Sequence, residues 1–335
     1  QGRPGSPPPG VYLRGEGGTP CPDPFPSPAG LPFPAREMVD RDRYRLGKRR
    51  LAQVITSRGC PHRCSYCTSS PFRPRSVDEV LAELRELQLR HGISAFDFED
   101  DNFSADRGRA REILSRMRAE LPLPFDLSFM NGLCVHDLDD GLIEELACCK
   151  VRSLGISLGG ATEEDRRLLL RPGTTAEIDR VIASAAARGI KLVVYFIIGV
   201  PGQAWQDLAA SLAWLAERDV VPCPSVYYPL PGKPGSHLPR ILWRSSAYAV
   251  ETGGADGFTR LDLVTLSRSS RVIAFLRKPP GASARDRIGI DLLQRLLATG
   301  QCWGQDTRPF PLPTSGRVAA ALLPAIECLA RARLS

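Results

Sequence analysis

Short apolar runs alternate with amphipathic stretches through the middle of this 335-residue chain. Within residues 77–90, apolar side chains recur every three or four positions, the spacing of one helical face. Ala95–Phe98 and Lys191–Ile198 are instead compact apolar runs of the length that buried strands have. The pattern therefore predicts strands and helices in turn.

Six strand and helix steps follow from this pattern. The predicted strands are Leu51–Thr56, Ala95–Phe98, Phe125–Met130, Ser153–Leu158, Lys191–Ile198 and Ser225–Tyr228. The predicted helices between them are Val77–Arg90, Arg107–Glu120, Leu138–Cys149, Ala176–Arg188 and Trp205–Arg218. Such alternation builds a parallel sheet with right-handed crossovers. We expect an α/β fold whose strand ends gather around one opening.

The two ends of the chain differ from this middle part. Gly and Pro dominate the first 30 residues, so we interpret residues 1–45 as a linker. Beyond Pro239 the pattern predicts helices without strands, at Arg260–Lys278, Asp286–Thr299 and Arg317–Arg333. We therefore expect a catalytic domain over residues 46–235 and a helical C-terminal extension over residues 236–335.

Composition and charge narrow the class of protein. The net charge is +7, but the basic residues are spread among acidic ones, and only Arg41–Arg50 is a concentrated basic run. This distribution favours a solvated surface or an interdomain contact over nucleic-acid binding. No long apolar stretch or signal peptide is visible, which argues against a membrane protein. Seven of the ten cysteines are scattered as free thiols would be, so a reducing cytoplasm is the expected compartment.

The other three cysteines form a tight motif. Cys60, Cys64 and Cys67 have the spacing C-x3-C-x2-C, with the aromatic Tyr66 just before the last. Three thiolates on one loop can hold three irons of a four-iron, four-sulfur cluster and leave the fourth iron open. A structural zinc ion is the alternative, but zinc needs a fourth ligand, and the nearest, His62, is sterically poor inside the same loop.

At this triplet the chain resembles the radical S-adenosylmethionine (SAM) superfamily, and the resemblance extends from about residue 31 to residue 276. It implies a (β/α)6 partial TIM barrel that binds a [4Fe-4S] cluster and SAM. The similarity is greatest to members with an N-terminal cobalamin-binding domain, whose D-x-H-x-x-G signature has no counterpart here. Together with the initial Gln this predicts a fragment of a longer protein, or a descendant without that domain, and cobalamin binding only in a longer form.

The resemblance assigns SAM-binding positions to the loops after the second and third strands. Asp100 and Asp101 match an acidic D-D-x-F run in the place of the motif that binds the SAM amino group. The alternative is a helix N-cap before Arg107. Asn131 matches an N-G position near the pocket, although an ordinary Asn-Gly turn explains it equally well.

The later loops carry further matches. Ser157 precedes Gly159, which stands where many relatives have a glutamate that contacts the ribose, and Ser157 or backbone amides could substitute for it. Arg171 matches a family R-P, could pair with the SAM carboxylate, and could also be a surface arginine. Ile197 and Gly199 belong to the strand end that holds adenine in the family; the glycine would let the backbone approach a flat ring.

These features predict a radical SAM enzyme that cleaves SAM to a 5'-deoxyadenosyl radical acting on a small-molecule or natural-product substrate, by methyl transfer or rearrangement. No catalytic residue beyond the cluster ligands is assigned. A low-potential donor such as flavodoxin or ferredoxin is implied. The alternatives are a tRNA methylthiotransferase-like enzyme and a non-catalytic iron-sulfur or zinc module.

Overall fold

The computed structural model describes residues 25–68, 70–228, 257–277 and 315–334. Its strands are β1 (Arg45–Leu46), β2 (Arg49–Val54), β3 (Ser57–Arg58), β4 (Arg73–Pro74), β5 (Ala95–Phe98), β6 (Asp126–Ser128), β7 (Leu133–Cys134), β8 (Ser153–Gly159), β9 (Lys191–Ile198) and β10 (Val220–Val226). Its helices are α1 (Val77–His91), α2 (Arg107–Glu120), α3 (Asp140–Cys148), α4 (Glu163–Leu168), α5 (Thr175–Ala187), α6 (Trp205–Ala216), α7 (Arg260–Leu276) and α9 (Gly316–Leu334). Short 3-10 turns are η1 (Arg36–Met38), η2 (Arg41–Arg43), η3 (Phe103–Ala105) and η4 (Val135–Asp137).

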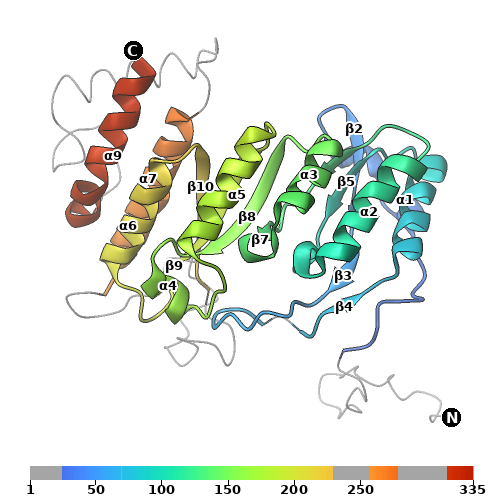
Figure 1. The fold of residues 1–335 in the computed structure, drawn as a ribbon, viewed down its shortest axis with the longest axis horizontal. Helices are drawn as coiled ribbons and strands as arrows, with labels where there is room; N and C mark the ends of the chain where they lie inside the picture. The colour runs from blue at the N-terminus through green and yellow to red at the C-terminus, as the bar shows by residue number, and fades with distance from the viewer. Residues whose placement is uncertain (1–24, 69, 229–256, 278–314, 335) are drawn as a thin grey trace.

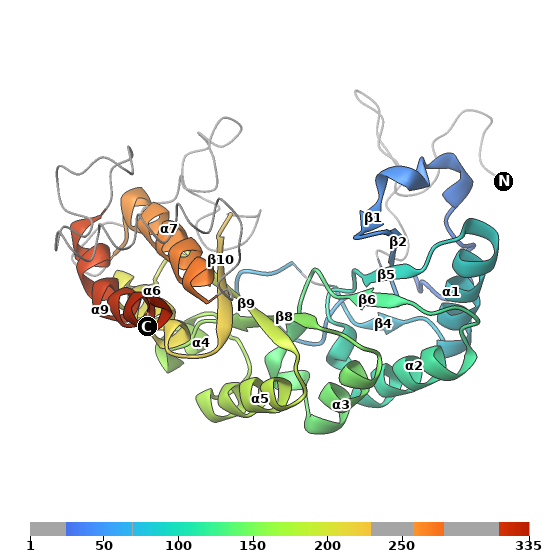
Figure 2. The same cartoon turned by 90° about the horizontal axis from the view of Figure 1, so that it is seen from above.

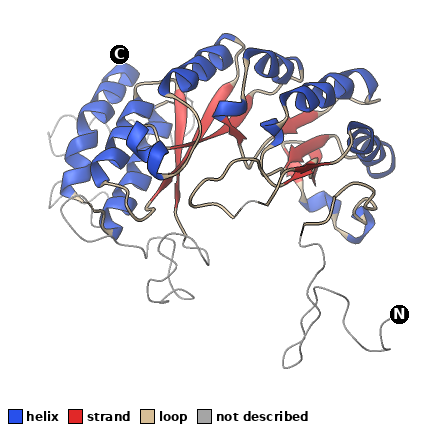
Figure 3. Ribbon diagram, turned by 60° about the horizontal axis from the view of Figure 1, so that its bottom comes forward, coloured by secondary structure: helices blue, strands red, loops and turns tan. Residues whose placement is uncertain are grey.

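The strands form an inner layer and the helices an outer one (Figures 1 and 3). Seen from above, the strands follow an open arc, and α1, α2, α3 and α5 lie along its outer side (Figure 2). This arrangement is an α/β partial barrel. None of the helices in the described part of the chain has both the length and the apolar character needed to cross a membrane.

The arc consists of two four-stranded sheets. One has the order β1-β2-β5-β6 and the other β10-β9-β8-β7, and all pairs except β1 with β2 are parallel. The predicted strand Phe125–Met130 is shorter in the structure, because a turn in which Gly132 N donates to Phe129 O separates β6 from β7. A single apolar core nevertheless covers both sheets, with Phe96 and Leu154 as fully buried examples.

The last strand is the one that the sequence pattern placed least well. The prediction began at Ser225, whereas β10 begins at Val220 and includes Pro222 and Pro224. Proline cannot donate to a sheet ladder and is tolerated in edge strands. Among the described strands β10 pairs only with β9, so it is such an edge, and the two prolines hid it from a pattern that treats proline as a strand breaker.

Helix starts are defined by side-chain caps. Ser76 with Glu79, Thr174 with Glu177, and Thr259 with Asp262 each form a reciprocal capping box. The predicted bounds of α2 agree with the structure, those of α1 differ by one residue at the C-terminal end, and those of α5 differ by one residue at each end.

Helices α7 and α9 lie beyond the last strand, at one end of the arc (Figure 2). Asp262 of α7 accepts hydrogen bonds from Ser315 Oγ at 2.5 Å and Arg317 Nη2 at 2.6 Å, which fixes the start of α9 against α7. The helix predicted at Asp286–Thr299 lies outside the described residues.

The Asp262 carboxylate should make the stability of the protein depend on pH. Burial raises its pKa, but the bonds from Arg317, Ser315 and Thr259 outweigh burial and hold the pKa at about 2. A free aspartate titrates near 3.9. The stabilisation is therefore complete above about pH 4 and is lost as pH falls toward 2.

We expect Asp262→Asn to lower the free energy of unfolding at pH 7 by about 1–3 kcal/mol, the range for hydrogen bonds to charged groups. The difference from wild type should shrink below pH 4 in urea titrations. The exposed Asp219 provides the control variant Asp219→Asn. A difference that stays constant from pH 7 to pH 2 would contradict the assignment.

Candidate functional site

The three predicted cysteines lie on one loop whose two ends are held together. Strands β3 and β4 pair in antiparallel fashion, with Ser57 opposite Pro74. Inside the loop, Cys60 N donates to Ser70 O at 2.9 Å and Cys67 N donates to Cys64 O at 3.1 Å. All three are free thiols. The loop therefore presents three sulfur donors within a short, folded segment.

Gly59 is required by the geometry of this loop. Its φ is +79°, and a Cβ at this position would lie 2.0 Å from Pro71 O. A side chain cannot be accommodated there without moving the backbone.

The acidic run after β5 anchors this loop. The Asp100 carboxylate is 2% exposed and accepts hydrogen bonds from Thr56 N at 2.6 Å, Thr56 Oγ1 at 2.5 Å and Ser57 Oγ at 2.6 Å. Asp101 Oδ2 accepts from Gly59 N at 2.7 Å. Both carboxylates thus bind the strand and the glycine that precede Cys60. Neither lines the cavity described below, which differs from the predicted contact with the SAM amino group.

Arg171 connects the cysteine loop to strand β8. Its Nη1 lies 3.5 Å from Cys64 Sγ, its Nη2 donates to Ser157 O at 2.7 Å, and its Nε is buried without a hydrogen-bond partner. Burial opposes the charged form, yet the negative charge that Cys134, Tyr66 and Cys64 can carry outweighs burial and raises the pKa of Arg171. A buried cation is therefore fixed beside the thiols.

Gly159 makes room for this arginine. Its φ is +83°, and a Cβ there would lie 2.8 Å from Arg171 Cγ. The residue that replaces the family's glutamate thus contributes space in which the Arg171 side chain packs.

A cavity of about 320 Å³ opens beside the cysteine loop, a size at the lower end of small-molecule sites. Its lining comes from the loop, from the turn after β6 and from the carboxyl-terminal parts of β8, β9 and β10, where barrel folds place their ligands. The lining residues are Tyr66, Met130, Asn131, Ser157, Gly159, Tyr195, Phe196, Ile197 and Ser225. Four predicted cofactor positions, Tyr66, Asn131, Ser157 and Ile197, therefore meet in one cavity.

Gly199 is another predicted position whose neighbours in the structure differ from the expected ones. It has a φ of +92°, and a Cβ there would meet Leu263 Cδ1 at 2.9 Å and Phe258 at 3.7 Å. It does not line the cavity. The close approach that requires glycine is to α7 and the residues just before it.

A second group beside the loop was not predicted. His62 Nε2 lies 2.7 Å from Asp137 Oδ2, and the donor atoms of His62, Asp137 and Cys134 all lie within 4.8 Å of one another. Asn102 Nδ2 donates to Asp137 Oδ2 at 2.7 Å. No sequence signal links these residues, because about 70 positions separate His62 from Cys134 and Asp137, and only the fold brings them together.

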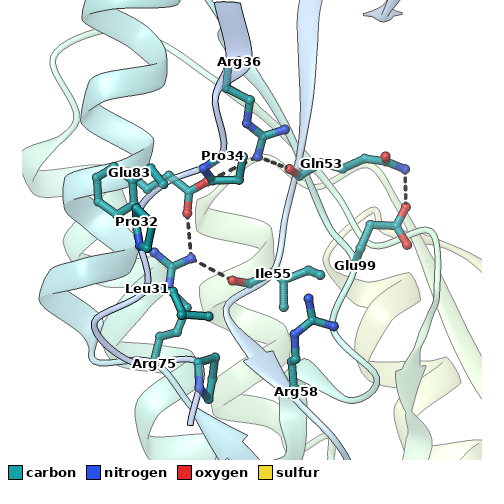
Figure 4. A pocket seen from close by; sticks show the side chains of 12 residues that line it. Leu31, Pro32, Pro34, Arg36, Gln53, Ile55, Arg58, Arg75, Glu83 and Glu99 are labelled. Atoms are coloured by element: carbon teal, nitrogen blue, oxygen red, sulfur yellow. Dashed lines mark hydrogen bonds and ion pairs between the residues drawn. The ribbon is translucent and has the colours of Figure 1, made fainter. Parts of the chain in front are cut away.

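A larger cavity, of about 480 Å³, lies between residues 28–36 and strand β2 (Figure 4). Arg36 Nη2 donates to Gln53 O at 2.7 Å and to Glu83 Oε1 at 3.3 Å. These contacts tie Arg36, within the predicted linker, to β2 and α1. No cysteine and no predicted cofactor residue lines this cavity, so we assign the cofactor to the smaller one.

A comparison with known protein families finds a match that includes the cysteine loop. A family model for the radical SAM superfamily matches residues 54–215, which include the cysteine loop and strands β5 to β9. Residues 54–215, about half of the chain, therefore match the radical SAM superfamily. Members of this superfamily use a [4Fe-4S] cluster and SAM.

Curated relatives match a little over half of the chain. An uncharacterized methyltransferase of Pyrococcus horikoshii is 24% identical over 195 residues, and the cytidylyl-2-hydroxyethylphosphonate methyltransferase of Streptomyces wedmorensis is 28% identical over 209. A ribosomal protein uS12 methylthiotransferase of Opitutus terrae is 27% identical over 204 residues. The matches cover 57%, 56% and 53% of this chain but only 42%, 38% and 43% of the relatives.

The residues present fit an iron-sulfur cluster. Three free thiols share one loop, and a buried guanidinium with an unpaired Nε–H lies beside them. A buried cation of this kind suits a group that carries negative charge on its sulfurs. His62 is bound to Asp137 by a hydrogen bond, so this contact does not support it as a fourth zinc ligand.

Removing the Asp100 carboxylate should release the cysteine loop. Asp100→Ala leaves three donors of Thr56 and Ser57 without their acceptor, and each unsatisfied buried group costs about 1–3 kcal/mol. We expect the free energy of unfolding to fall by at least about 2 kcal/mol, and iron incorporation to fall with it. The control Asp126→Ala removes only a surface ion pair with Arg49, which typically contributes less than about 1 kcal/mol. Equal stability of the two variants would show that Asp100 is no anchor.

Proposed function

We propose that this chain acts as a radical SAM enzyme on a small molecule, by methyl transfer or by rearrangement. The observation that carries the proposal is the position of the cavity: it adjoins the cysteine loop, and Tyr66 of that loop forms part of its wall. A molecule in this cavity would lie next to the open iron of a cluster on Cys60, Cys64 and Cys67. When bound, the cluster supplies the electron that splits the sulfonium of SAM.

The side chains around the cavity have separate tasks in this proposal. Ser157 and Asn131 offer polar groups to the ribose and amino acid parts of SAM, and Ile197 with Tyr66 offers apolar surface to adenine. Arg171 holds the cysteine loop against β8 through its bonds to Cys64 Sγ and Ser157 O. Since its Nε–H has no partner, it can also donate to an anionic group.

We propose that residues 46–235 form the radical SAM barrel with six strand and helix units, in which β6 and β7 are the two halves of one interrupted strand. Residues 236–335 would then be a helical extension, and the structure describes α7 and α9 within it. A low-potential donor such as flavodoxin or ferredoxin would supply the electron. Methyl transfer is favoured by the two relatives named as methyltransferases.

A methylthiotransferase is the second candidate, because a relative with that name matches the chain with similar identity and coverage. The two reactions differ in product. Transfer of a methylthio group adds sulfur to the substrate, and methyl transfer does not. Mass spectrometry of the product separates them by one sulfur atom.

The cluster can be tested directly. Anaerobic reconstitution should give about four irons per chain, because three thiolates suit a cubane with one open iron. Cys64→Ala should abolish the cluster, whereas Cys148→Ala, which removes an exposed thiol on α3, should retain it. Stoichiometric zinc without the visible absorption of an iron-sulfur cluster would refute the proposal and favour a zinc module.

The cavity can be tested with two serines of one strand. Ser157 lines the cavity, whereas Ser153 is exposed at the opposite end of β8. Ser157→Trp should fill the cavity, weaken SAM binding at least about tenfold, which corresponds to about 1.4 kcal/mol, and leave the iron content unchanged. Ser153→Trp should bind SAM like wild type in equilibrium titrations. Unchanged SAM affinity of Ser157→Trp would place the SAM site elsewhere.

A further inference from the structure

The side chain of Asn102 lies between the cysteine loop and the η4 turn. Its Nδ2 is 3.6 Å from Cys60 Sγ and 2.7 Å from Asp137 Oδ2, and its Oδ1 accepts from Ser104 Oγ at 2.9 Å. The residue is 2% exposed. A primary amide has two N–H groups, so one is available for each neighbour, and the Ser104 contact fixes which end of the amide faces the sulfur.

The acceptor on the other side of Asn102 is itself held firmly. Asp137 Oδ2 also lies 2.7 Å from His62 Nε2. Arg107 donates from Nε to Asp137 O at 2.9 Å and from Nη2 to His136 O at 2.8 Å, which fixes the backbone of the η4 turn. Asn102 is therefore oriented from two sides, by Ser104 and by Asp137.

The same neighbourhood could be considered a mononuclear metal site of His62, Cys134 and Asp137. The distances argue against it. Ligands at about 2.0–2.1 Å from a tetrahedral zinc ion lie roughly 3.3 Å from one another, whereas His62 Nε2 and Asp137 Oδ2 are 2.7 Å apart, a hydrogen-bond distance. The group is better described as hydrogen-bonded side chains beside the cysteine loop.

We propose that Asn102 is a positioning residue that donates an N–H to the Cys60 sulfur and raises the reduction potential of a cluster bound there. The inference rests on the proposed function. Hydrogen bonds to cluster sulfurs are among the factors that set such potentials, and outer-shell partners tune a metal through its ligands. Reduction adds one negative charge beside the amide, so an N–H dipole aimed at the sulfur stabilises the reduced state more than the oxidised state.

The test compares reduction potentials in the absence of SAM. Wild type, Asn102→Leu, Ser104→Ala and Gln88→Leu are reconstituted anaerobically, their iron is counted, and their midpoint potentials are measured by redox titration with electron paramagnetic resonance. Asn102→Leu should lower the reduction equilibrium constant about tenfold, equivalent to about 59 mV for one electron. Ser104→Ala keeps the amide but frees its orientation, so it should shift the potential in the same direction and by less.

The matched control is Gln88→Leu, because the Gln88 amide is also 2% exposed and its Nε2 donates to Leu123 O at 2.8 Å, away from the cysteine loop and the cavity. Its potential should equal that of wild type. Full iron content with an unshifted potential in Asn102→Leu overturns the inference and leaves the proposed function intact. If Asn102→Leu loses iron, an unshifted potential in Ser104→Ala overturns it instead.

Two further outcomes are decisive. Wild type that holds no iron overturns the proposed function, and the inference falls with it. Stoichiometric zinc that survives reconstitution and disappears in Cys134→Ser would assign His62 and Asp137 to a metal ion and overturn the role of Asn102.

Discussion

The buried carboxylate of Asp100 holds the cysteine loop in place. It accepts three hydrogen bonds from Thr56 and Ser57, directly before the loop, and Asp101 accepts a fourth from the backbone of Gly59. Because Asp100 follows β5 and Thr56 follows β2, these bonds tie together the carboxyl ends of two neighbouring parallel strands. The geometry of the thiols, and hence of any group bound to them, depends on this junction. The cost of burying a carboxylate is offset because both of its oxygens are bonded.

The opposite side of the loop depends on Arg171. This residue comes from the segment after α4, far from the cysteines in sequence, and it reaches both Cys64 and the backbone of β8. Its position requires the space that Gly159 leaves. Gly159 and Arg171 are thus two parts of one packing arrangement. A glutamate at position 159 would add a side chain where the arginine now lies.

Much of the fold could be predicted because its signals are local. The strand Lys191–Ile198 and the helix Arg107–Glu120 have the predicted bounds, since the apolar pattern that defines them lies within the element itself. The predicted start of β10 was five residues too late, because its prolines are tolerated only in an edge strand. Which strand lies at the edge depends on the order of strands in the sheet, and a local sequence pattern does not contain that order. The break between β6 and β7 likewise depends on tertiary packing around the Gly132 turn.

In the candidate site, too, local features could be predicted and features that depend on tertiary packing could not. The spacing of Cys60, Cys64 and Cys67 is local, so the sequence alone was enough to place three thiols on one loop and to suggest the family. The hydrogen-bond partners of Asp100 could not be predicted in the same way. An acidic run near a pocket suggests a site for a cationic group, and only the fold shows that Thr56, 44 residues earlier, donates to this carboxylate. Gly199 resembles a glycine that faces a ligand, yet the side chain that it accommodates is Leu263, which is 64 residues away in sequence. Sequence reasoning identified positions that matter and could not assign their partners.

Charge explains why acidic residues can surround a site for an anionic cluster. Asp100 and Asp101 direct their oxygens to donors of Thr56, Ser57 and Gly59, and Asp137 directs one to His62 and Asn102. Each carboxylate therefore has hydrogen-bond donors close by. The groups nearest the sulfurs are instead N–H donors, from Arg171 at Cys64 and from Asn102 at Cys60. The acids thus order the backbone of the loop, while N–H groups of Arg171 and Asn102 point at two of its sulfurs, and such hydrogen bonds are among the factors that tune an iron-sulfur cluster.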